Sequence, residues 1–563
     1  MAWTRRMFLK TLGTASAGAT FGSLSTSLNA GCQKPPAFDV LIQNGTVIDG
    51  TGAASYRADI GIIGQQIVEI GHLAQKGGKT VIDARGLVVA PGFIDIHSHT
   101  DLTLLANPKA ESKARQGVTT EVAGQDGSSL APLSPDMRKR LQDGPGKRYG
   151  IEIDWQDFRG LFNRLEQQGI GVNFISFVGQ GTIRELVVGQ ENVPATLPQV
   201  GEMKTLVDKA IATGAWGLSS GLEYPPGGFA TLDEISELCR TAKSYGVLYA
   251  THIRNEDDTL LEAIDEAIAT ARAAEIGLQI SHVKASGRRN WGKIFEVLKK
   301  IEQANADGLD IACDRYPYIA YATGLTNLFP LWSRDGGTDS FIERLQDAQQ
   351  LPTIKEAVLA KVDMLGAWDA VMITSVTLNK NRPFQGKRVS QIVEATQQDP
   401  FEFVTNLLIE ERASVEMVGF GMSEDELKRV ISHPLVMIAS DGTAVAPYGV
   451  LSKSTPHPRF YGTFPRVLGK YVREEKLLDL PTAIHKMSGM PAQRLGLKDR
   501  GRIDVGCAAD VVVFNPQTIA DQADFLDPHQ YPVGIEYVLV NGTVVIKQGK
   551  HTGALPGKAL RRA

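Results

Sequence analysis

The chain has 563 residues and a formal net charge of -4, with 43% hydrophobic and 22% charged residues. This composition is ordinary for a globular protein with a large core, and the lack of a basic excess argues against nucleic-acid binding. The four cysteines lie far apart and form no CxxC pair, so we expect scattered thiols rather than a disulfide framework. They are Cys32, Cys239, Cys313 and Cys507.

The first 32 residues predict an export signal rather than part of the fold. Arg5 and Arg6 precede a weakly apolar stretch that is rich in Ala, Gly and Ser. Paired arginines before a modest apolar run are typical of a twin-arginine signal peptide, and the run is too short and too polar to span a membrane. We therefore expect export to a periplasmic or other extracytoplasmic location. Cleavage after Ala30 and lipidation at Cys32 are two alternative ends of this signal, and a lipid there would be the chain's contact with a membrane.

Both ends of the remaining chain have the pattern of short β-strands. Residues 38–92 contain runs such as DVLIQNGTVID, in which Asn44-Gly45 is a hairpin signal. Residues 496–563 repeat the pattern in ADVVVFN and EYVLVNGTVVIKQGK. Two β-rich ends that flank a long middle predict one small β-sandwich formed from both termini.

The middle of the chain, residues 93–495, alternates strand-like runs with amphipathic helical stretches. Eight apolar, β-branched runs in this order predict an α/β fold, a closed parallel (β/α)8 TIM barrel. A long connection at 320–435, between strands seven and eight, is apolar enough to fold and is expected to be an insertion that covers the barrel mouth. The eight runs fall at 93–99, 119–124, 171–180, 217–222, 247–254, 278–285, 309–318 and 436–442.

Metal-binding residue types recur where these strands end. His97 and His99 end the first strand, His252 the fifth and His282 the sixth, while Asp441 follows the eighth. Barrel active sites lie at this face, and histidine and aspartate bind zinc and related divalent ions. Residues two apart on a strand share a side. We therefore expect His97 and His99 to bind one metal together, with His252 and His282 converging on a second.

Several runs resemble a known family. PGFIDIHSH (91–99) is similar to the opening signature of the amidohydrolase superfamily. The runs GLSSGLEYPPG, YATHIRNE, ISHVKASG, DRYPY, ASDG, HPRFYGTFPRVLGKYVR and GRIDVGCAADVVVFNP resemble, within it, the D-aminoacylase (N-acyl-D-amino-acid deacylase) family. The resemblance covers nearly the whole chain after about residue 38. It implies a barrel plus sandwich and zinc-dependent hydrolysis, with one or two ions, of N-acyl-D-amino acids to a carboxylate and a free D-amino acid.

The resemblance also implies roles for individual residues. His97, His99 and Asp441 would form a first, weaker metal site, while His252 and His282 would belong to a tighter one. Asp441 would accept the proton of the attacking water and deliver it to the leaving amine, which is general acid–base catalysis.

One position departs from the family pattern. At the end of strand two the family typically has Gly-Asn-Cys-Gly, whose cysteine binds metal, where this sequence has Gly124-Gln125-Asp126-Gly127. Asp126 would then replace the cysteine with a harder ligand that can bridge two ions. The alternative is that Asp126 only makes a turn.

The resemblance implies a binding site for the substrate α-carboxylate. Arg254 and Lys284 each lie two residues beyond a metal histidine, and the family uses matching residues there. It uses them together with tyrosines like Tyr224 and one of Tyr316 or Tyr318. An arginine can form a bidentate pair with a carboxylate.

Three other functions remain open at this point. The first is a cyclic-amide hydrolase of the dihydroorotase or hydantoinase type. The lack of a lysine after strand four, in GLSSGLEY, and the YATHIRNE and DRYPY runs count against it. The second is an exported dipeptidase, whose substrate would be a short peptide. The third is a non-catalytic binding protein, which the retention of all the metal-binding residue types makes hard to support.

Overall fold

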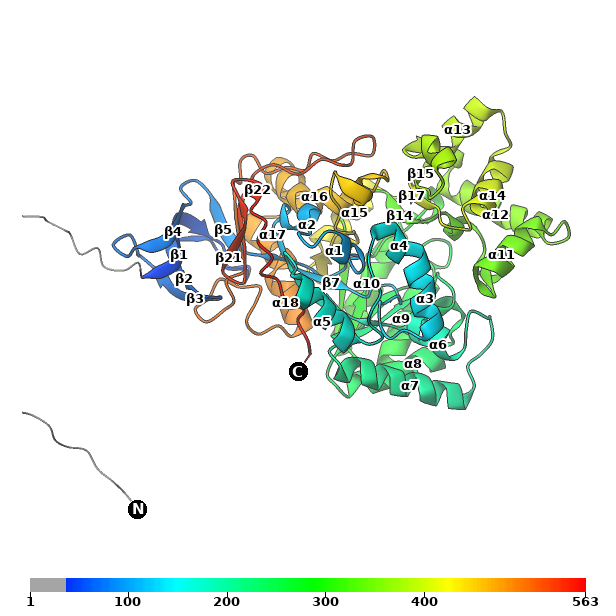
Figure 1. The fold of residues 1–563 in the computed structure, drawn as a ribbon, viewed down its shortest axis with the longest axis horizontal. Helices are drawn as coiled ribbons and strands as arrows, with labels where there is room; N and C mark the ends of the chain where they lie inside the picture. The colour runs from blue at the N-terminus through cyan, green and yellow to red at the C-terminus, as the bar shows by residue number, and fades with distance from the viewer. Residues whose placement is uncertain (1–36, 563) are drawn as a thin grey trace, which may run out of the picture.

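The computed structural model describes residues 37–562. The predicted signal peptide, residues 1–32, lies outside the described residues together with Cys32. Three parts follow one another along the long axis of the molecule: a β-domain, a barrel and an α/β insertion (Figure 1). Within the described range, no helix has the length and apolar character needed to cross a membrane.

Eight parallel strands form the barrel, which confirms the predicted fold class. A short strand, β9 (Val178–Gly179), continues the third barrel strand after Phe177 and pairs with the fourth. An isolated parallel bridge between Ser98 and Gly442 joins the ends of the first and eighth strands and closes the ring. The eight strands are β6 (Phe93–Asp95), β7 (Val118–Ala123), β8 (Asn173–Ser176), β10 (Gly217–Gly221), β11 (Leu248–His252), β12 (Leu278–Ile280), β13 (Ile311–Arg315) and β18 (Val436–Ile438).

Amphipathic helices cover the outside of the barrel (Figure 1). In α8 (Leu232–Lys243), the Thr231 hydroxyl caps the N-terminus by accepting from the Glu234 N–H at 3.2 Å. The buried residues of α8 recur every three or four positions, as a helix packed on a barrel requires. The other main helices are α5 (Phe158–Gln168), α7 (Leu197–Ala212), α9 (Leu260–Ala274), α10 (Lys293–Ala306), α15 (Glu424–Ser432), α17 (Leu480–Met487) and α18 (Gly489–Leu495).

The interior and the base of the barrel are packed with side chains, so they leave no room for chemistry. Ile96, Val122 and Met437 are among the buried residues that fill the interior. The last residues of the chain run beside β8: the Phe174 N–H donates to the Lys558 carbonyl, and the Leu560 N–H donates to the Phe174 carbonyl, both at 2.8 Å. Polar function is therefore confined to the opposite end, where the strands finish.

The two ends of the chain form one β-domain, as the sequence predicts. β5 pairs antiparallel with β19, with Val89 opposite Val513, and this pairing joins the two ends in a single sheet. Residues from both ends, such as Ile60 and Leu539, share its buried core. The strands are β1 (Phe38–Val47), β2 (Tyr56–Ile63), β3 (Gln66–Gly71), β4 (Gly78–Asp83), β5 (Val88–Pro91), β19 (Val511–Phe514), β20 (Ile535–Val540), β21 (Thr543–Lys547) and β22 (Lys550–His551).

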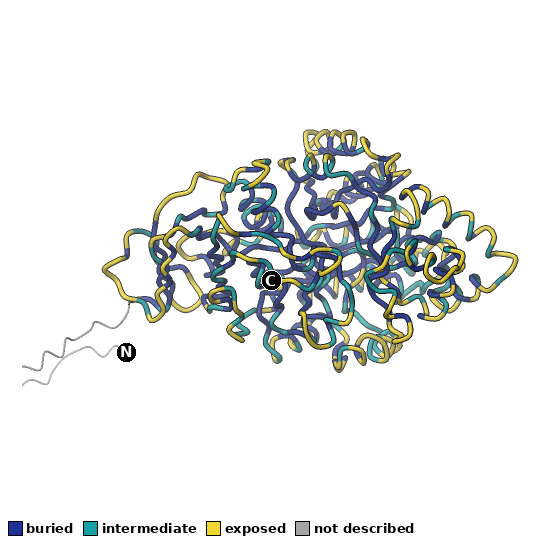
Figure 2. Tube along the Cα trace, turned by 90° about the horizontal axis from the view of Figure 1, so that it is seen from above, coloured by how far each residue is buried: buried dark blue, intermediate teal, exposed yellow. Residues whose placement is uncertain are grey.

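The connection between β13 and β18 folds as an insertion with its own sheet, in the order β14-β17-β15-β16, and its own core. Exposed residues gather at its far end and on the β-domain, whereas the chain through the barrel is mostly buried (Figure 2). The elements of the insertion are β14 (Tyr321–Gly324), β15 (Val371–Ser375), β16 (Lys387–Arg388), β17 (Glu416–Gly419), α11 (Gly337–Gln346), α12 (Leu351–Leu365), α13 (Val389–Thr396) and α14 (Pro400–Glu410).

The barrel resumes earlier than the predicted end of the insertion at residue 435. Helix α15 lies inside the predicted segment 320–435, but it contacts α10 and β18 of the barrel. Its buried residues Leu427, Val430 and Ile431 belong to the barrel core because they form the apolar face of an ordinary barrel helix.

Candidate metal centre

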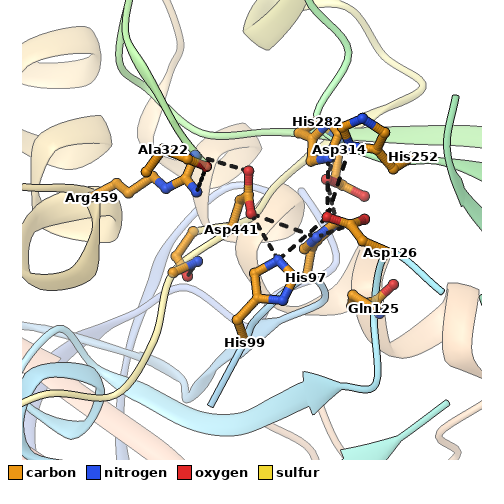
Figure 3. Close-up of polar contacts among 12 residues, drawn as sticks. His97, His99, Gln125, Asp126, His252, His282, Asp314, Ala322, Asp441 and Arg459 are labelled. Carbon is orange, nitrogen blue, oxygen red and sulfur yellow. Dashed lines mark hydrogen bonds and ion pairs between the residues drawn. The ribbon is translucent and has the colours of Figure 1, made fainter. Parts of the chain in front are cut away.

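Six side chains from five strand ends meet at the mouth of the barrel (Figure 3). His97 and His99 follow β6, Asp126 follows β7, His252 is the last residue of β11, His282 follows β12 and Asp441 follows β18. We call them the metal-ligand cluster. They are His97, His99, Asp126, His252, His282 and Asp441.

The first set of possible ligands contains four residues. The His97 Nε2 lies 3.5 Å from Asp126 Oδ1 and 3.7 Å from Asp441 Oδ1. The His99 Nε2 lies 3.4 Å from Asp126 Oδ2 and 3.1 Å from Asp441 Oδ1. Ligand atoms at zinc bond lengths of about 2.0–2.1 Å in tetrahedral geometry are roughly 3.3 Å apart. These four side chains are therefore spaced to hold one ion.

The second set contains three residues and shares Asp126 with the first. The Asp126 Oδ2 lies 3.6 Å from His282 Nε2 and 3.9 Å from His252 Nδ1, and the two histidine nitrogens are 2.9 Å apart. Asp126 thus lies within 4 Å of all four histidines, the arrangement expected of a bridging carboxylate. The alternative that Asp126 only makes a turn does not account for this placement.

The backbone of this cluster adopts conformations that non-glycine residues rarely take. Asp126 has φ +52°, His282 φ +35° and Asp441 φ +47°. Gly124 precedes Asp126, and a Cβ there would lie 2.1 Å from the Phe177 carbonyl oxygen. The close packing of the strand ends therefore sets the directions of these side chains.

Buried polar atoms in this cluster lack partners. Among the described residues, neither ring nitrogen of His97 nor Asp126 Oδ1 makes a hydrogen bond, although all are buried. The His97 Nδ1 faces Asp314 at 3.6 Å, but the His97 Nε2 and Asp126 Oδ1 face each other at 3.5 Å. Buried polar atoms are nearly always paired, so these two facing atoms indicate a ligand between them. A divalent cation fits, since imidazole nitrogens and carboxylate oxygens are its usual donors.

The charges of the cluster attract one another strongly. Burial acts to lower the pKa of His97, but Asp126 and Asp314 hold it well above its ordinary value. Burial acts to raise the pKa of Asp126, but His97 and His282 hold it well below. The carboxylates therefore stay ionised and able to bind a cation.

Asp441 lies between the histidines and an arginine. Its Oδ1 faces His97 and His99, while its Oδ2 lies 2.9 Å from the Arg459 Nη1. Burial acts to raise the pKa of Asp441, but Arg459 and the nearby histidines hold it well below its ordinary value. His457 positions this arginine: its Nδ1 accepts from the Arg459 N–H and its Nε2 donates to the Ala320 carbonyl, both at 2.9 Å.

Arg459 is a residue that sequence reasoning missed. It is buried, lines the cavity above the cluster, and its Nε has no hydrogen-bond partner within residues 37–562. Its signal in the sequence is the run HPR (457–459), which lies well beyond strand eight and so outside the rule that active-site residues follow strand ends.

Two glutamates orient the histidines of the second set, and sequence reasoning missed both. The His252 Nε2 lies 3.4 Å from Glu223 Oε2, and the His282 Nδ1 lies 3.0 Å from Glu256 Oε1. A carboxylate on the outer nitrogen of a histidine fixes its tautomer and leaves the inner nitrogen for the metal. Both glutamates stand in runs that resemble the family, GLEY and RNE.

A cavity of about 710 Å³ opens over the metal-ligand cluster. Loops of the barrel and residues of the insertion line it, including Tyr224 and Lys284 of the predicted substrate site. The Lys284 ammonium is already paired with the Glu256 carboxylate and lies 2.9 Å from the His282 Nδ1. The Tyr224 ring packs 4.9 Å from that of His252.

The structure contradicts the predicted role of Arg254. Its guanidinium forms an ion pair with Glu266 at 2.8 Å and donates to the carbonyls of Gly228 and Ala230. The prediction extended the two-residue alternation of β11 beyond His252, where the strand ends. The chain turns there, so Arg254 is not among the residues that line the cavity.

The two candidate tyrosines after β13 lie in different places. Tyr316 is fully buried, its ring centroid 4.5 Å from the Arg459 guanidinium. Tyr318 instead donates its hydroxyl to Asp521 at 3.4 Å, so of the two alternatives it is the one that points away from the metal-ligand cluster, and neither tyrosine lines the cavity. Tyr318 lies beside the C-terminal segment because Pro317 separates it from the end of β13.

Known proteins resemble the chain over nearly its full length. The sequence matches the Amidohydrolase family at residues 80–143 and 350–546. It is 35% identical over 530 residues to a D-aminoacylase of Alcaligenes xylosoxydans xylosoxydans, covering 93% of this chain and 98% of that one. The crystal structure of an N-acyl-D-glutamate deacylase from Bordetella bronchiseptica, with zinc and a phosphonate inhibitor bound, matches with a TM-score of 0.79 at 33% identity, over 93% of this chain and 99% of that one. A dihydroorotase of Bacillus pumilus matches 127 residues at 33% identity, which is 23% of this chain and 26% of that one.

Proposed function

This chain belongs to the D-aminoacylase family of amidohydrolases, and on that premise we propose that it hydrolyses the amide bond of N-acyl-D-amino acids. The products are a carboxylate and a free D-amino acid. The observation that carries the proposal is the metal-ligand cluster itself: two ligand sets share Asp126, and Asp441 joins them to a buried arginine in one cavity.

The residues fit one or two divalent ions, and zinc is the ion named for the Bordetella relative. Bound here, such an ion would polarise the amide carbonyl and lower the pKa of water. His97, His99, Asp126 and Asp441 would hold one ion. Asp126, His252 and His282 would hold a second.

Asp441 is the residue placed to move protons. One carboxylate oxygen faces the histidines, where the water would be bound, and the other faces Arg459. Arg459 favours the ionised form, so Asp441 can accept the proton of the attacking water. The Asp441 oxygen that faces the histidines then delivers that proton to the leaving amide nitrogen.

Arg459, rather than the predicted Arg254, is the partner of the substrate α-carboxylate in this proposal. It offers a partly unpaired guanidinium inside the cavity, next to the catalytic carboxylate. Tyr224 lines the same cavity, and so does Lys284, whose ammonium is already paired with Glu256. A substrate carboxylate at Arg459 would bring the adjacent amide to the metal-ligand cluster.

The similarity to acyl-amino-acid deacylases is the reason to prefer this function over a cyclic-amide hydrolase. It spans 93% of the chain, whereas the similarity to the dihydroorotase spans 23%. A dipeptidase would use the same cluster, so N-terminal aminoacyl groups belong in the substrate test. A non-catalytic role is disfavoured by a complete set of ligands in an accessible cavity.

We also propose that the protein is exported by the twin-arginine route and acts outside the cytoplasm. The support is Arg5-Arg6 before a weakly apolar stretch. Mass spectrometry of the N-terminal peptide of the mature protein tests this proposal. Cleavage near Ala30, or a lipid-modified Cys32, supports it. An intact N-terminus in the cytoplasmic fraction contradicts it.

The activity is tested with zinc-loaded protein and matched N-acetyl-D- and N-acetyl-L-amino acids, by measuring the free amino acid released. Hydrolysis of D-isomers alone supports the proposed function. Hydrolysis of dipeptides or dihydroorotate in preference to every N-acetyl-D-amino acid contradicts it.

A further inference from the structure

The cavity has two chemically different sides. Loops after β6, β7 and β18 line one side with Leu102, Leu141 and Leu451, beside the charged residues Asp101 and Arg148. Loops after β10, β11 and β12 lie across the barrel and line the other side together with the insertion. We call this second side the polar recess. It consists of Glu223, Asp257, Ser286, Asn327 and Lys361.

The insertion and the barrel build the polar recess together. Asn327 and Lys361 come from the insertion, Lys361 from α12. The Asn327 amide donates to Glu223 Oε2 at 3.0 Å, and the Lys361 ammonium forms an ion pair with Asp257. Glu223 also touches the histidine ligand His252, so the recess begins at the metal-ligand cluster.

The positive charges at the recess are already neutralised. Lys361 is paired with Asp257, and the neighbouring Lys284 is paired with Glu256. Glu223 adds a carboxylate to the recess, with its Oε2 3.0 Å from the Asn327 amide and 3.4 Å from the His252 Nε2. Along the described walls of this recess, an entering carboxylate would meet no unpaired cation. Burying a charge without a partner is strongly unfavourable.

The recess does offer hydrogen bonds to an uncharged group. The Ser286 hydroxyl and the Asn327 amide line it, and Glu223 Oε1 accepts no hydrogen bond from a described residue. With its α-carboxylate at Arg459 and its amide over the cluster, a substrate has two remaining groups to place. The side with the leucines suits an acyl chain, which leaves the polar recess for the amino-acid side chain.

We propose that the polar recess is the side-chain subsite and that it selects D-amino acids with uncharged, hydrogen-bonding side chains over acidic ones. The Lys361–Asp257 pair is the specificity-determining element, because it cancels the one cation of the recess that an acidic side chain could use. This inference rests on the proposed function. Sequence identity alone does not predict this side-chain specificity, because the chain is about equally similar to a D-aminoacylase and to an N-acyl-D-glutamate deacylase.

The test compares N-acetyl-D-glutamine with N-acetyl-D-glutamate, which differ in charge but hardly in shape, with N-acetyl-D-leucine as the apolar reference. A buried charge without a partner is unfavourable, so we expect kcat/KM to favour glutamine over glutamate by roughly 10–100-fold. We also expect glutamine to be preferred over leucine. A preference for glutamate or for leucine overturns the inference.

Two variants test the ion pair. Asp257→Asn releases the Lys361 ammonium and should shift the glutamine-to-glutamate ratio toward glutamate by about tenfold. Lys361→Met leaves Asp257 unpaired and should shift the glutamine-to-glutamate ratio toward glutamine. It should also raise activity on N-acetyl-D-lysine relative to N-acetyl-D-norleucine. The ratios compare substrates on one protein preparation, so partial unfolding does not change them.

The matched control is Asp265→Asn, which breaks an exposed pair with Lys300 (2.7 Å) on the outside of the barrel. It should leave every ratio unchanged. If Asp257→Asn also leaves the glutamine-to-glutamate ratio unchanged, the ion pair does not set specificity and the inference is wrong. If no N-acetyl-D-amino acid is hydrolysed by metal-loaded protein, the proposed function fails and this inference fails with it.

Discussion

Two clusters of buried charge share the strand ends β6, β7 and β18, and they differ in how fully their groups are paired. In the first, which we call the seam cluster, the Lys113 ammonium lies 2.7 Å from Asp95, 3.0 Å from Glu121 and 2.7 Å from the Ser440 hydroxyl. Among the described residues, the seam cluster has one buried atom without a hydrogen-bond partner, Glu121 Oε2, whereas the metal-ligand cluster has three, both ring nitrogens of His97 and Asp126 Oδ1.

The difference separates a structural role from a functional one. β6 and β18 share only an isolated bridge, and Lys113 spans this seam by donating to Ser440 and to the Gly442 carbonyl (3.0 Å), on either side of Asp441. A paired buried cation of this kind holds the backbone in place. The unpaired atoms one step along the strands mark the position that a ligand must complete.

The largest expected effect concerns Asp441. Asp441→Asn removes the proton acceptor but keeps an oxygen donor, so we expect kcat to fall by about 10²–10⁴-fold with metal content retained. Steady-state kinetics and elemental analysis of the same sample measure the two. Asp101→Asn, at another carboxyl that lines the cavity, is the control and should cost far less. Near-normal turnover in Asp441→Asn would remove Asp441 from the mechanism.

The seam cluster is expected to act on stability. Lys113→Met leaves Asp95 and Glu121 buried without their cation, so the free energy of unfolding should fall by roughly 3–5 kcal/mol. Urea denaturation measures this change. Lys300→Met breaks an exposed pair and should cost less than about 1 kcal/mol. Equal effects of the two substitutions would show that the seam cluster has no special role.

Removal of metal should destabilise the metal-ligand cluster and leave the contacts of the seam cluster in place. A ligand present at 100 times its Kd stabilises the folded state by about 2.7 kcal/mol, so chelation should lower the Tm and added zinc should restore it. Thermal unfolding measures the shift, and Asp126→Ala should make it smaller. An identical Tm with and without chelator would contradict the metal assignment.

The same comparison applies to two arginines. Arg254 is bound by Glu266 and two carbonyls, whereas the Nε of Arg459 has no partner in the described part of the chain. A hydrogen bond to a charged group contributes about 1.5–3 kcal/mol, so Arg459→Met should raise KM by roughly 10–100-fold. Arg254→Met should lower the Tm and leave KM almost unchanged. The reverse pattern would restore the role that the sequence suggested for Arg254.

The smallest effect is expected at Glu121. Burial raises its pKa above the ordinary 4.5, and Lys113 only partly offsets this. The folded protein therefore holds this proton more tightly than the unfolded chain, and the stability it contributes is lost as the pH rises from 4.5 through the raised pKa. Glu121→Gln imitates the protonated form. In metal-free protein, the free energy of unfolding of Glu121→Gln relative to that of the wild type should rise by on the order of 1 kcal/mol from pH 5 to pH 8. Urea unfolding measures this difference, and the same difference between variant and wild type at both pH values would contradict the prediction.

The fold could be predicted from the sequence because strand and helix periodicities alternate clearly and each helix has a defined apolar face. The rule that active-site residues follow the strand ends located the side chains that lie on or just beyond a strand, such as His252 and Asp441. It failed for Arg254 because β11 stops at His252. It could not find Arg459, which reaches the cluster from the start of α16 (Arg459–Arg466) after a long loop. Such a residue is placed by tertiary packing, which leaves no periodic signal.

The pairing of β5 with β19, and of the chain's last residues with β8, has a consequence for synthesis. A ribosome completes β5 and β8 long before it makes their partners. Until β19 has been made, the nascent β-domain exposes an open strand edge at β5, which is a template for aggregation. Chaperones that cover this edge during translation should therefore matter more for the yield of this protein than for one whose domains are completed in chain order.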